Sequence, residues 1–170
     1  MYGGESLLAR SARLLIDAGL APRVVVLAAA AEAHREALAG LDVEIALNPA
    51  PEQGISSSIR VGLRAVRGVD GAVITVCDQP FCTAEHLKLL VETARVSGAQ
   101  IVASGYADVA GVPAFFRSSV FSRLENLTGN RGAATVIRGF LHGDSAGLRV
   151  VPFPEGAIDI DTTDDLARLF

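Results

Sequence analysis

Segments with a helical period alternate with short apolar runs along most of the chain. Between residues 6 and 18, leucine and isoleucine recur at helical spacing, and Gly19 follows as a C-cap. The segment 23–28 instead contains a continuous run of valine and leucine, which is typical of a short buried strand. By the same criteria, strands are predicted at 23–28, 42–47, 71–76, 99–104, 111–116 and 148–153. Helices are predicted at 6–18, 31–39, 55–66, 83–96, 118–127, 131–141 and 163–169.

This alternation predicts a single α/β domain over residues 1–170, with a mostly parallel sheet and helices on both of its faces. The chain opens on a helix directly after Gly3 and Gly4, whereas a helix in such a fold normally follows a strand. A leading strand would supply the first phosphate-binding turn. We therefore expect an exposed edge or a gap in the middle of the sheet, which a homodimer could cover.

Charge and residue counts exclude several functional classes. A formal net charge of −4 does not suit nucleic-acid binding, and Lys88 is the only lysine, so the chain has no P-loop. It has no G-x-G-x-x-G motif and no Ser/His/Asp or Cys/His arrangement, and we interpret Cys77 and Cys82 as reduced thiols. No apolar run is long enough to span a bilayer, and the N-terminus does not resemble a signal peptide, so we expect a cytoplasmic protein.

Asp78 is the strongest candidate for chemistry. It follows the apolar run at 71–76 and precedes Gln79 and Pro80. Ligands gather at the carboxyl ends of parallel strands, and a carboxylate at such a position can hold Mg²⁺, which in turn can hold phosphates. An aspartate in an ordinary surface turn is the alternative, but the position after a buried strand favours a metal ligand.

Asp161 has two interpretations. Asp161 or Thr162 fits as the N-cap of the last predicted helix. If the segment is extended, Asp159 and Asp161 point to the same side, and Asp161 could bind a metal. The two roles are compatible, since Thr162 can cap the helix while Asp161 points at a metal, and the sequence leaves both open.

A glycine turn at Gly54 precedes three serines, Ser56 to Ser58, at the start of a predicted helix. Hydroxyls and free N–H groups at a helix start can bind an anion or the edge of a base. Asn48 precedes Pro49, which favours an extended conformation, so its amide could also contact a base edge. Taken alone this pattern is weak, because serine is a common cap residue.

Two further turns could contact a substrate. In the turn between Gly129 and Gly132, Asn130 fits as the N-cap of the helix that follows, which is the interpretation we favour, and Arg131 could contact an acidic substrate. Gly111 begins a turn with Val112 and Pro113, and it could let a ligand approach the backbone closely.

In their order and spacing, these motifs make the chain similar to the MobA-like nucleotidyltransferases, and within them to the molybdenum cofactor cytidylyltransferase branch. The resemblance runs from Tyr2 to the C-terminus. Its landmarks, in the order of the family, are Asn48-Pro49, Gly54-Ile55-Ser56-Ser57-Ser58, Arg60, Gly62-Leu63, Cys77-Asp78-Gln79-Pro80, Gly111-Val112-Pro113, Gly129-Asn130-Arg131-Gly132-Ala133 and Asp159-Ile160-Asp161-Thr162.

The resemblance implies a three-layer α/β/α, Rossmann-like nucleotidyltransferase fold. It implies Mg²⁺-dependent transfer of CMP from CTP to molybdopterin, with release of pyrophosphate. Asp78 would be the principal metal ligand and catalytic residue, and Asp161 the second carboxylate. The residues expected to contact the nucleotide are Asn48, Gly54, Ser57 and Ser58. The residues expected on the acceptor side are Gly111, Pro113 and Arg131.

The chain departs from the family pattern in three places. The signature Leu-Ala-Ala-Gly with its Arg- and Lys-bearing loop is absent, and with it the first strand and the triphosphate cradle. Val112 stands where cytidylyltransferases often have histidine, and Asn130 where aspartate is usual. We therefore expect the 170-residue form to be poorly active.

Several alternatives to this expectation stay open. The chain could be an inactive or weakly binding relative in molybdenum cofactor maturation that serves a molybdoenzyme assembly partner. It could instead be a guanylyltransferase or a sugar-phosphate nucleotidyltransferase. A start codon further upstream would make the chain part of a longer enzyme.

Overall fold

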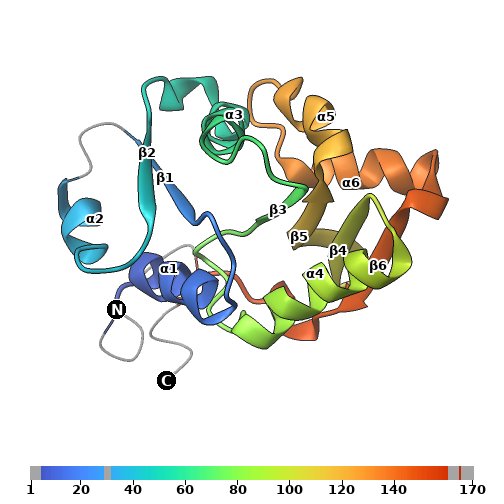
Figure 1. The fold of residues 1–170 in the computed structure, drawn as a ribbon, viewed down its shortest axis with the longest axis horizontal. Helices are drawn as coiled ribbons and strands as arrows, with labels where there is room; N and C mark the ends of the chain where they lie inside the picture. Colours follow the sequence, from blue (N-terminus) through green and yellow to red (C-terminus); the bar gives the residue numbers. More distant parts are fainter. Residues whose placement is uncertain (1–4, 29–31, 161–164, 166–170) are drawn as a thin grey trace.

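The computed structural model describes residues 5–28, 32–160 and 165, and it confirms an α/β fold (Figure 1). Its strands are β1 (Val24–Ala28), β2 (Glu44–Asn48), β3 (Gly71–Ile74), β4 (Ile101–Tyr106), β5 (Val109–Arg117) and β6 (Leu148–Pro152). Its helices are α1 (Leu7–Asp17), α2 (Glu32–Ala37), α3 (Ile55–Ala65), α4 (Ala84–Ser97), α5 (Phe121–Glu125) and α6 (Ala133–His142). Short 3₁₀ turns are η1 (Pro51–Gln53), η2 (Ser118–Val120), η3 (Ser145–Gly147) and η4 (Pro154–Ala157).

The strands form two sheets. β1 and β2 are parallel, and the larger sheet has the order β3-β5-β4-β6. In that sheet β5 runs antiparallel to both β3 and β4, whereas β4 and β6 are parallel. Within the described residues no ladder joins β1 to β3, so each presents a strand edge toward the middle of the molecule. A homodimer that covers these edges stays a prediction.

Helices cover both faces of the sheets and produce three layers. In Figure 1, α1 and α4 lie on one side and α3, α5 and α6 on the other. Side chains alternate along β4, so that Ile101 and Ala103 join the cluster under α5 and α6, while Val102 joins the cluster under α4. The strand is thus buried on both faces, as its apolar run predicts. No helix in the described part of the chain has the length and apolarity needed to cross a bilayer.

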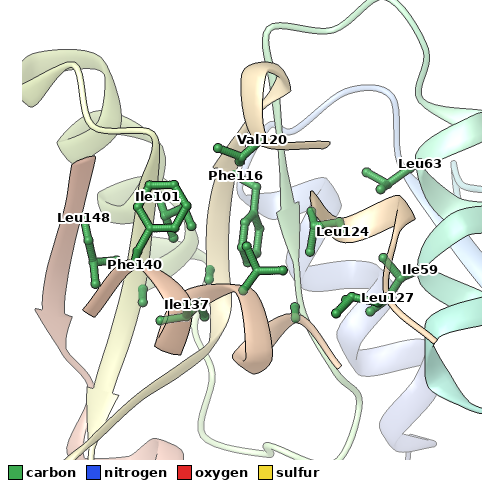
Figure 2. Packing of buried hydrophobic residues seen from close by; sticks show 14 residues of the cluster. Ile59, Leu63, Ile101, Phe116, Val120, Leu124, Leu127, Ile137, Phe140 and Leu148 are labelled. Atoms are coloured by element: carbon green, nitrogen blue, oxygen red, sulfur yellow. The ribbon is translucent and has the colours of Figure 1, made fainter. Parts of the chain in front are cut away.

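The larger core lies between the four-stranded sheet and the helices α3, α5 and α6 (Figure 2). Phe116 of β5 and Phe140 of α6 are completely buried there, and both are among the largest buried side chains. Leu124 of α5 and Ile59 of α3 belong to the same cluster. This core attaches α3, and with it the turn at Gly54, firmly to the sheet.

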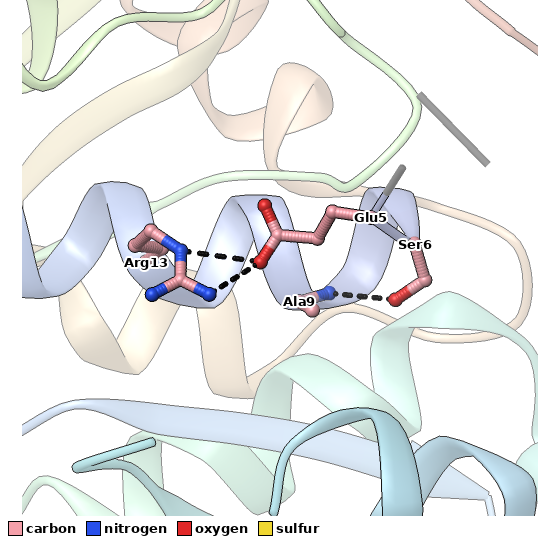
Figure 3. A network of polar contacts seen from close by, with 4 residues as sticks. All are labelled: Glu5, Ser6, Ala9 and Arg13. Atoms are coloured by element: carbon pink, nitrogen blue, oxygen red, sulfur yellow. Dashed lines mark hydrogen bonds and ion pairs between the residues drawn. The ribbon is translucent and has the colours of Figure 1, made fainter. Parts of the chain in front are cut away.

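The first helix begins where its local sequence predicts (Figure 3). The Ser6 side chain accepts a hydrogen bond from the N–H of Ala9 at 3.1 Å, which caps α1. The Glu5 carboxylate accepts two hydrogen bonds from the Arg13 guanidinium, at 3.1 and 2.7 Å. Gly19 follows the helix with a φ of +69°, a conformation that glycine adopts without strain.

Several predicted boundaries are wrong. Strand β3 ends at Ile74 rather than at residue 76, and the helix predicted at 118–127 is the turn η2 followed by the short α5. Helix α6 begins at Ala133, and its N-cap is Gly132 without a side-chain hydrogen bond, so Asn130 is not the cap. The reason is an additional turn before the helix, closed by the N–H of Arg131 on the Thr128 carbonyl at 3.3 Å. The last predicted helix lies outside the described residues apart from Asp165.

A buried histidine links α4 to the β4–β5 hairpin. His86 Nε2 lies 2.7 Å from Ser104 Oγ, and Ser104 Oγ donates to the Pro113 carbonyl at 2.5 Å. Since the single hydroxyl proton goes to Pro113, Ser104 accepts from His86, and the proton of the neutral ring is on Nε2. The His86 ring also stacks on Phe153, with 4.5 Å between the centroids.

We expect the free energy of unfolding to fall as the pH falls below about 6.5. Burial lowers the pKa of His86, and the Glu155 charge opposes this only in part. The unfolded chain therefore binds a proton at a pH where the folded chain does not, and stability is lost as the pH falls through the pKa of the folded state. Urea unfolding between about pH 7.5 and 5.5 should show a steeper loss in wild type than in His86→Gln.

His142→Gln, at the exposed end of α6, is the matched control for this measurement. It should keep the wild-type pH dependence, because His142 lies outside the buried network. Equal slopes for wild type and His86→Gln would contradict the prediction.

Candidate active site

Asp78 lies just beyond β3, where the strand gives way to a turn. Its backbone carbonyl accepts a hydrogen bond from the N–H of Ile160 at 2.8 Å. This bond brings the segment with Asp159 to the end of β3, although more than seventy residues separate the two along the chain. Arg10 of α1 donates to the Pro80 carbonyl at 3.0 Å and fixes the other end of the turn.

Asp161 itself lies outside the described residues. Its neighbour Ile160 is the residue whose N–H hydrogen-bonds to the Asp78 carbonyl. The role of Asp161 as second carboxylate stays a prediction.

The turn at Asp78 also reaches Tyr106 through Gly156. Gln79 Nε2 donates to the Gly156 carbonyl at 3.0 Å, and a Cβ at Gly156 would lie 2.7 Å from the Tyr106 ring. Burial raises the pKa of Tyr106, a hydrogen bond from Gln79 opposes this, and the charges of Asp159 and Asp78 raise it further. Cys77 is exposed at the surface, but partial desolvation of its thiol and, after it, the Asp78 charge raise the pKa, so Cys77 stays protonated and is a poor nucleophile at neutral pH. We call Asp78 and Asp159 the carboxylate corner.

The carboxylate corner has the donor chemistry of a Mg²⁺ or Mn²⁺ site. Carboxylate oxygens are the ligands that these hard cations prefer, and Mg²⁺ is often held by one or two carboxylates together with phosphates and water. Among the described residues no group of three or more His, Cys, Asp or Glu side chains is arranged to hold a metal. The residues present therefore fit a metal that a bound nucleotide helps to hold, rather than an all-protein cage.

The structure brings together three of the four residues predicted to contact the nucleotide. The Asn48 amide donates to Ser57 Oγ at 2.8 Å and to Ser58 Oγ at 3.0 Å. Its carbonyl oxygen accepts from the N–H of Ala50 at 3.0 Å, and the side chain is almost completely buried. Asn48 therefore orders the loop between β2 and α3, and a direct contact with a base would require its amide to leave the two hydroxyls.

The fourth residue, Gly54, lies against the turn predicted on the acceptor side. Its φ is +82°, and a Cβ at this position would overlap Asn130 Oδ1 and lie 2.6 Å from the carbonyl group of Gly129. The N–H of Ser56 donates to the Gly129 carbonyl at 3.2 Å, and the N–H of Ser57 to the Gly54 carbonyl at 3.0 Å. The expectation of free N–H groups is thus wrong for these two serines, because each N–H group donates a hydrogen bond to a backbone carbonyl.

The turn at 129–132 is held by α3 from a second side. Arg60 of α3 donates to the Leu127 carbonyl at 2.6 Å. Arg131 is exposed in the same turn, and the described contacts do not join its guanidinium to the carboxylate corner. Arg131 as an acceptor contact stays a prediction.

Gly111 and Pro113 are buried in the β4–β5 hairpin. A Cβ at Gly111 would overlap the Tyr106 hydroxyl and lie 2.9 Å from the ring carbon that carries it. The close neighbour that requires glycine at this position is therefore Tyr106, whereas the sequence suggested a ligand. Contact of either residue with an acceptor stays a prediction.

Two residues of this site escaped sequence reasoning. Asp159 is visible in the alternation with Asp161, but the resemblance implies a role for Asp161 alone. Tyr106 had no local signal, because its importance depends on contacts with segments that fold back onto it.

An open hollow of about 510 Å³ lies at the tip of the β4–β5 hairpin. Its lining is largely apolar, and Tyr106 is the residue that it shares with the surroundings of the carboxylate corner. The lining residues are Gly105, Tyr106, Ala107, Asp108, Val109, Ala110, Leu141, Val150 and Pro154.

The model of the MobA-like NTP transferase domain family matches residues 1–146. The chain belongs to this family. The match includes the Asp78 turn, the Asn48–Ser58 loop and the turn at 129–132, and it ends before Asp159. Members of this family bind nucleoside triphosphates, and membership supports nucleotidyltransferase activity in general.

Comparison with known proteins gives this MobA-like domain one curated relative and several solved neighbours. It is 32% identical over 116 residues to the purine catabolism protein PucB of Bacillus subtilis (strain 168). The aligned part is 67% of this chain and 55% of PucB, so the chain matches about half the length of this relative.

Among solved structures, Rv0371c of Mycobacterium tuberculosis H37Rv is 28% identical with a TM-score of 0.77, over 99% of this chain and 86% of that chain. A second structure of Rv0371c is a complex with manganese. A nucleotidyl transferase of Methanothermobacter thermautotrophicus has a TM-score of 0.82 at 22% identity, over 99% of this chain and 81% of that chain. At this identity the last likeness shows the fold alone.

Proposed function

We propose that the chain is a metal-dependent nucleotidyltransferase that transfers CMP from CTP to molybdopterin. The observation that carries the proposal is the carboxylate corner: Asp78 lies at the end of β3, and the segment of Asp159 is hydrogen-bonded to it. The manganese complex of Rv0371c supports a divalent metal in this family, and we propose Mg²⁺ as the resident ion. The choice of CTP and molybdopterin rests on the resemblance described above.

In the proposed reaction an oxygen of the acceptor phosphate attacks the α-phosphorus of CTP. The new P–O bond forms as the bond between the α-phosphorus and the bridging oxygen breaks, and pyrophosphate leaves with the electron pair. When bound, the metal would neutralise phosphate charge. This chemistry needs no protein nucleophile, in keeping with a protonated Cys77.

The residues of the chain have distinct parts in this proposal. Asp78 and Asp159, with Asp161 as predicted, would hold the metal. The loop that Asn48 orders would receive the nucleotide, with Gly54, Ser57 and Ser58 along its wall. Since Gly54 lies against the turn at 129–132, we propose that nucleotide and acceptor meet there, with Arg131 near the acceptor phosphate and Gly111 and Pro113 behind it.

Thermal denaturation with CTP, GTP or ATP, each with and without Mg²⁺, tests the proposal. We expect CTP to raise the melting temperature, whereas GTP and ATP should not. The rise with CTP should require Mg²⁺. At about one hundred times its Kd, a ligand stabilises by about 2.7 kcal/mol, or roughly 5–10 °C for a chain of this size. A rise with GTP but not with CTP would make GTP the nucleotide of the proposed reaction. No rise with any of the three nucleotides would contradict the proposal.

A further inference from the structure

The β4–β5 hairpin contains a bulge at the residues predicted to face the acceptor. Ala103 pairs with Ala114, and the next residue, Ser104, pairs with Gly111. Val112 and Pro113 therefore have no partner in the ladder with β4. Bulges next to active sites redirect the backbone, and their carbonyl groups need other hydrogen-bond donors.

Two hydroxyl groups from β4 supply these donors. Tyr106 donates to the Val112 carbonyl at 3.0 Å, and Ser104 donates to the Pro113 carbonyl at 2.5 Å. The two donors are two residues apart on one strand, so they lie on the same face of β4. The carbonyl groups of Val112 and Pro113 therefore accept hydrogen bonds from side chains of β4, where a regular ladder would supply backbone N–H groups.

The two donors differ in their surroundings. Ser104 is completely buried and contacts His86, so it belongs to the core. Tyr106 is half-buried, and its ring packs against Gly156, whose carbonyl accepts a hydrogen bond at 3.0 Å from Gln79, the residue next to Asp78. Of the two, only Tyr106 connects the bulge with the place where we propose that phosphates bind.

The Tyr106 ring is fixed from several sides. It makes an edge contact with Phe153, with 6.3 Å between the centroids. A Cβ at Gly111 would overlap its hydroxyl, and a Cβ at Gly156 would lie 2.7 Å from its ring. The two glycines let the backbone approach the ring closely, so the hydroxyl has one well-defined position against Val112.

We propose that Tyr106 is a positioning residue, which holds the bulge at Gly111–Pro113 beside the carboxylate corner and thereby sets the affinity for the phosphorylated acceptor. The inference rests on the proposed function and adds to it a residue outside every motif of the sequence. Tyr106 acts through the Val112 carbonyl, and the phenol donates only in its protonated form. A tyrosine is protonated at neutral pH, and burial raises the pKa of Tyr106 further.

Tyr106→Phe removes the hydroxyl and keeps the ring, so it tests the hydrogen bond without opening a cavity. We would measure three quantities on the full chain: the melting temperature, the Kd of Mn²⁺ alone by electron paramagnetic resonance, and the Kd of molybdopterin without nucleotide by calorimetry. The expected result is a rise of about tenfold in the Kd of molybdopterin, as the loss of one hydrogen bond predicts. The Kd of Mn²⁺ should stay within about twofold.

Ser97→Ala is the matched control, because the Ser97 hydroxyl also donates to a backbone carbonyl, that of Thr93, at the exposed end of α4. It should change neither Kd. An unchanged Kd of molybdopterin in folded Tyr106→Phe would overturn the inference, and so would an equal weakening of Mn²⁺ and molybdopterin. If the wild-type chain binds Mn²⁺ but not molybdopterin, the acceptor of the proposed function is overturned, and this inference with it.

Discussion

Asp78→Asn should abolish metal-dependent nucleotide binding and, with it, the residual nucleotidyl transfer expected of this form, because loss of a metal ligand's charge lowers such a rate by on the order of a thousandfold. The amide has almost the same shape as the carboxylate but no charge, so it cannot neutralise Mg²⁺. The turn should survive, because it is held by the backbone bond from Ile160 to Asp78 and by the bond from Arg10 to Pro80. Binding of Mn²⁺ by electron paramagnetic resonance and pyrophosphate release from CTP with molybdopterin measure the effect.

The same variant has a readout that needs no substrate. The Asp78 charge is one of the causes that raise the pKa of Tyr106, so its removal should lower that pKa toward the ordinary value for tyrosine. Absorbance of tyrosinate during an alkaline titration measures it. Asp17→Asn, on the exposed end of α1, is the matched control and should leave metal binding and the titration unchanged. Wild-type Mn²⁺ affinity in Asp78→Asn would contradict the metal assignment.

Gly54→Ala should destabilise the fold by roughly 3 kcal/mol and weaken nucleotide binding at the same time. Gly54 has φ +82° and ψ 179°, a region that is essentially restricted to glycine. The new Cβ would also lie 2.6 Å from the carbonyl group of Gly129, which is backbone and cannot rotate away. Urea unfolding gives the loss of stability, and the thermal shift with CTP and Mg²⁺ gives the loss of binding.

Gly68→Ala shows what a positive φ costs where the new Cβ has no contact. Gly68 has the same φ of +82°, but a Cβ there would meet nothing within 4 Å. It should therefore cost only the conformational penalty, about 1 kcal/mol, and should leave nucleotide binding intact. Equal losses in the two variants would mean that neither the extended ψ of Gly54 nor its contact with the turn at 129–132 has energetic importance.

Much of the local structure was predictable because its causes lie within a few residues. Ser6 caps α1 and Thr83 caps α4 through their own hydroxyls, and Gly19 and Gly98 follow these helices with positive φ. Apolar runs, and alternation in the segment 42–47, predicted the strands of the described residues, since a strand buried on both faces needs successive apolar residues and a half-buried one needs alternate ones. The boundaries of β3 and α6 were wrong, because they depend on a strand partner and on a turn that closes on Thr128.

The sequence by itself determined the α/β class, the order of the elements and the candidate at Asp78, since apolar periodicity and the end of an apolar run are local features. Only the tertiary structure decided which distant segments meet. It brought Asp159 to Asp78, Gly129 to Gly54, and the Tyr106 hydroxyl to Val112. These contacts depend on how the helices pack on the two sheets. A single side chain such as Asn48, which has the chemistry to contact a base, can therefore be used to order a loop instead.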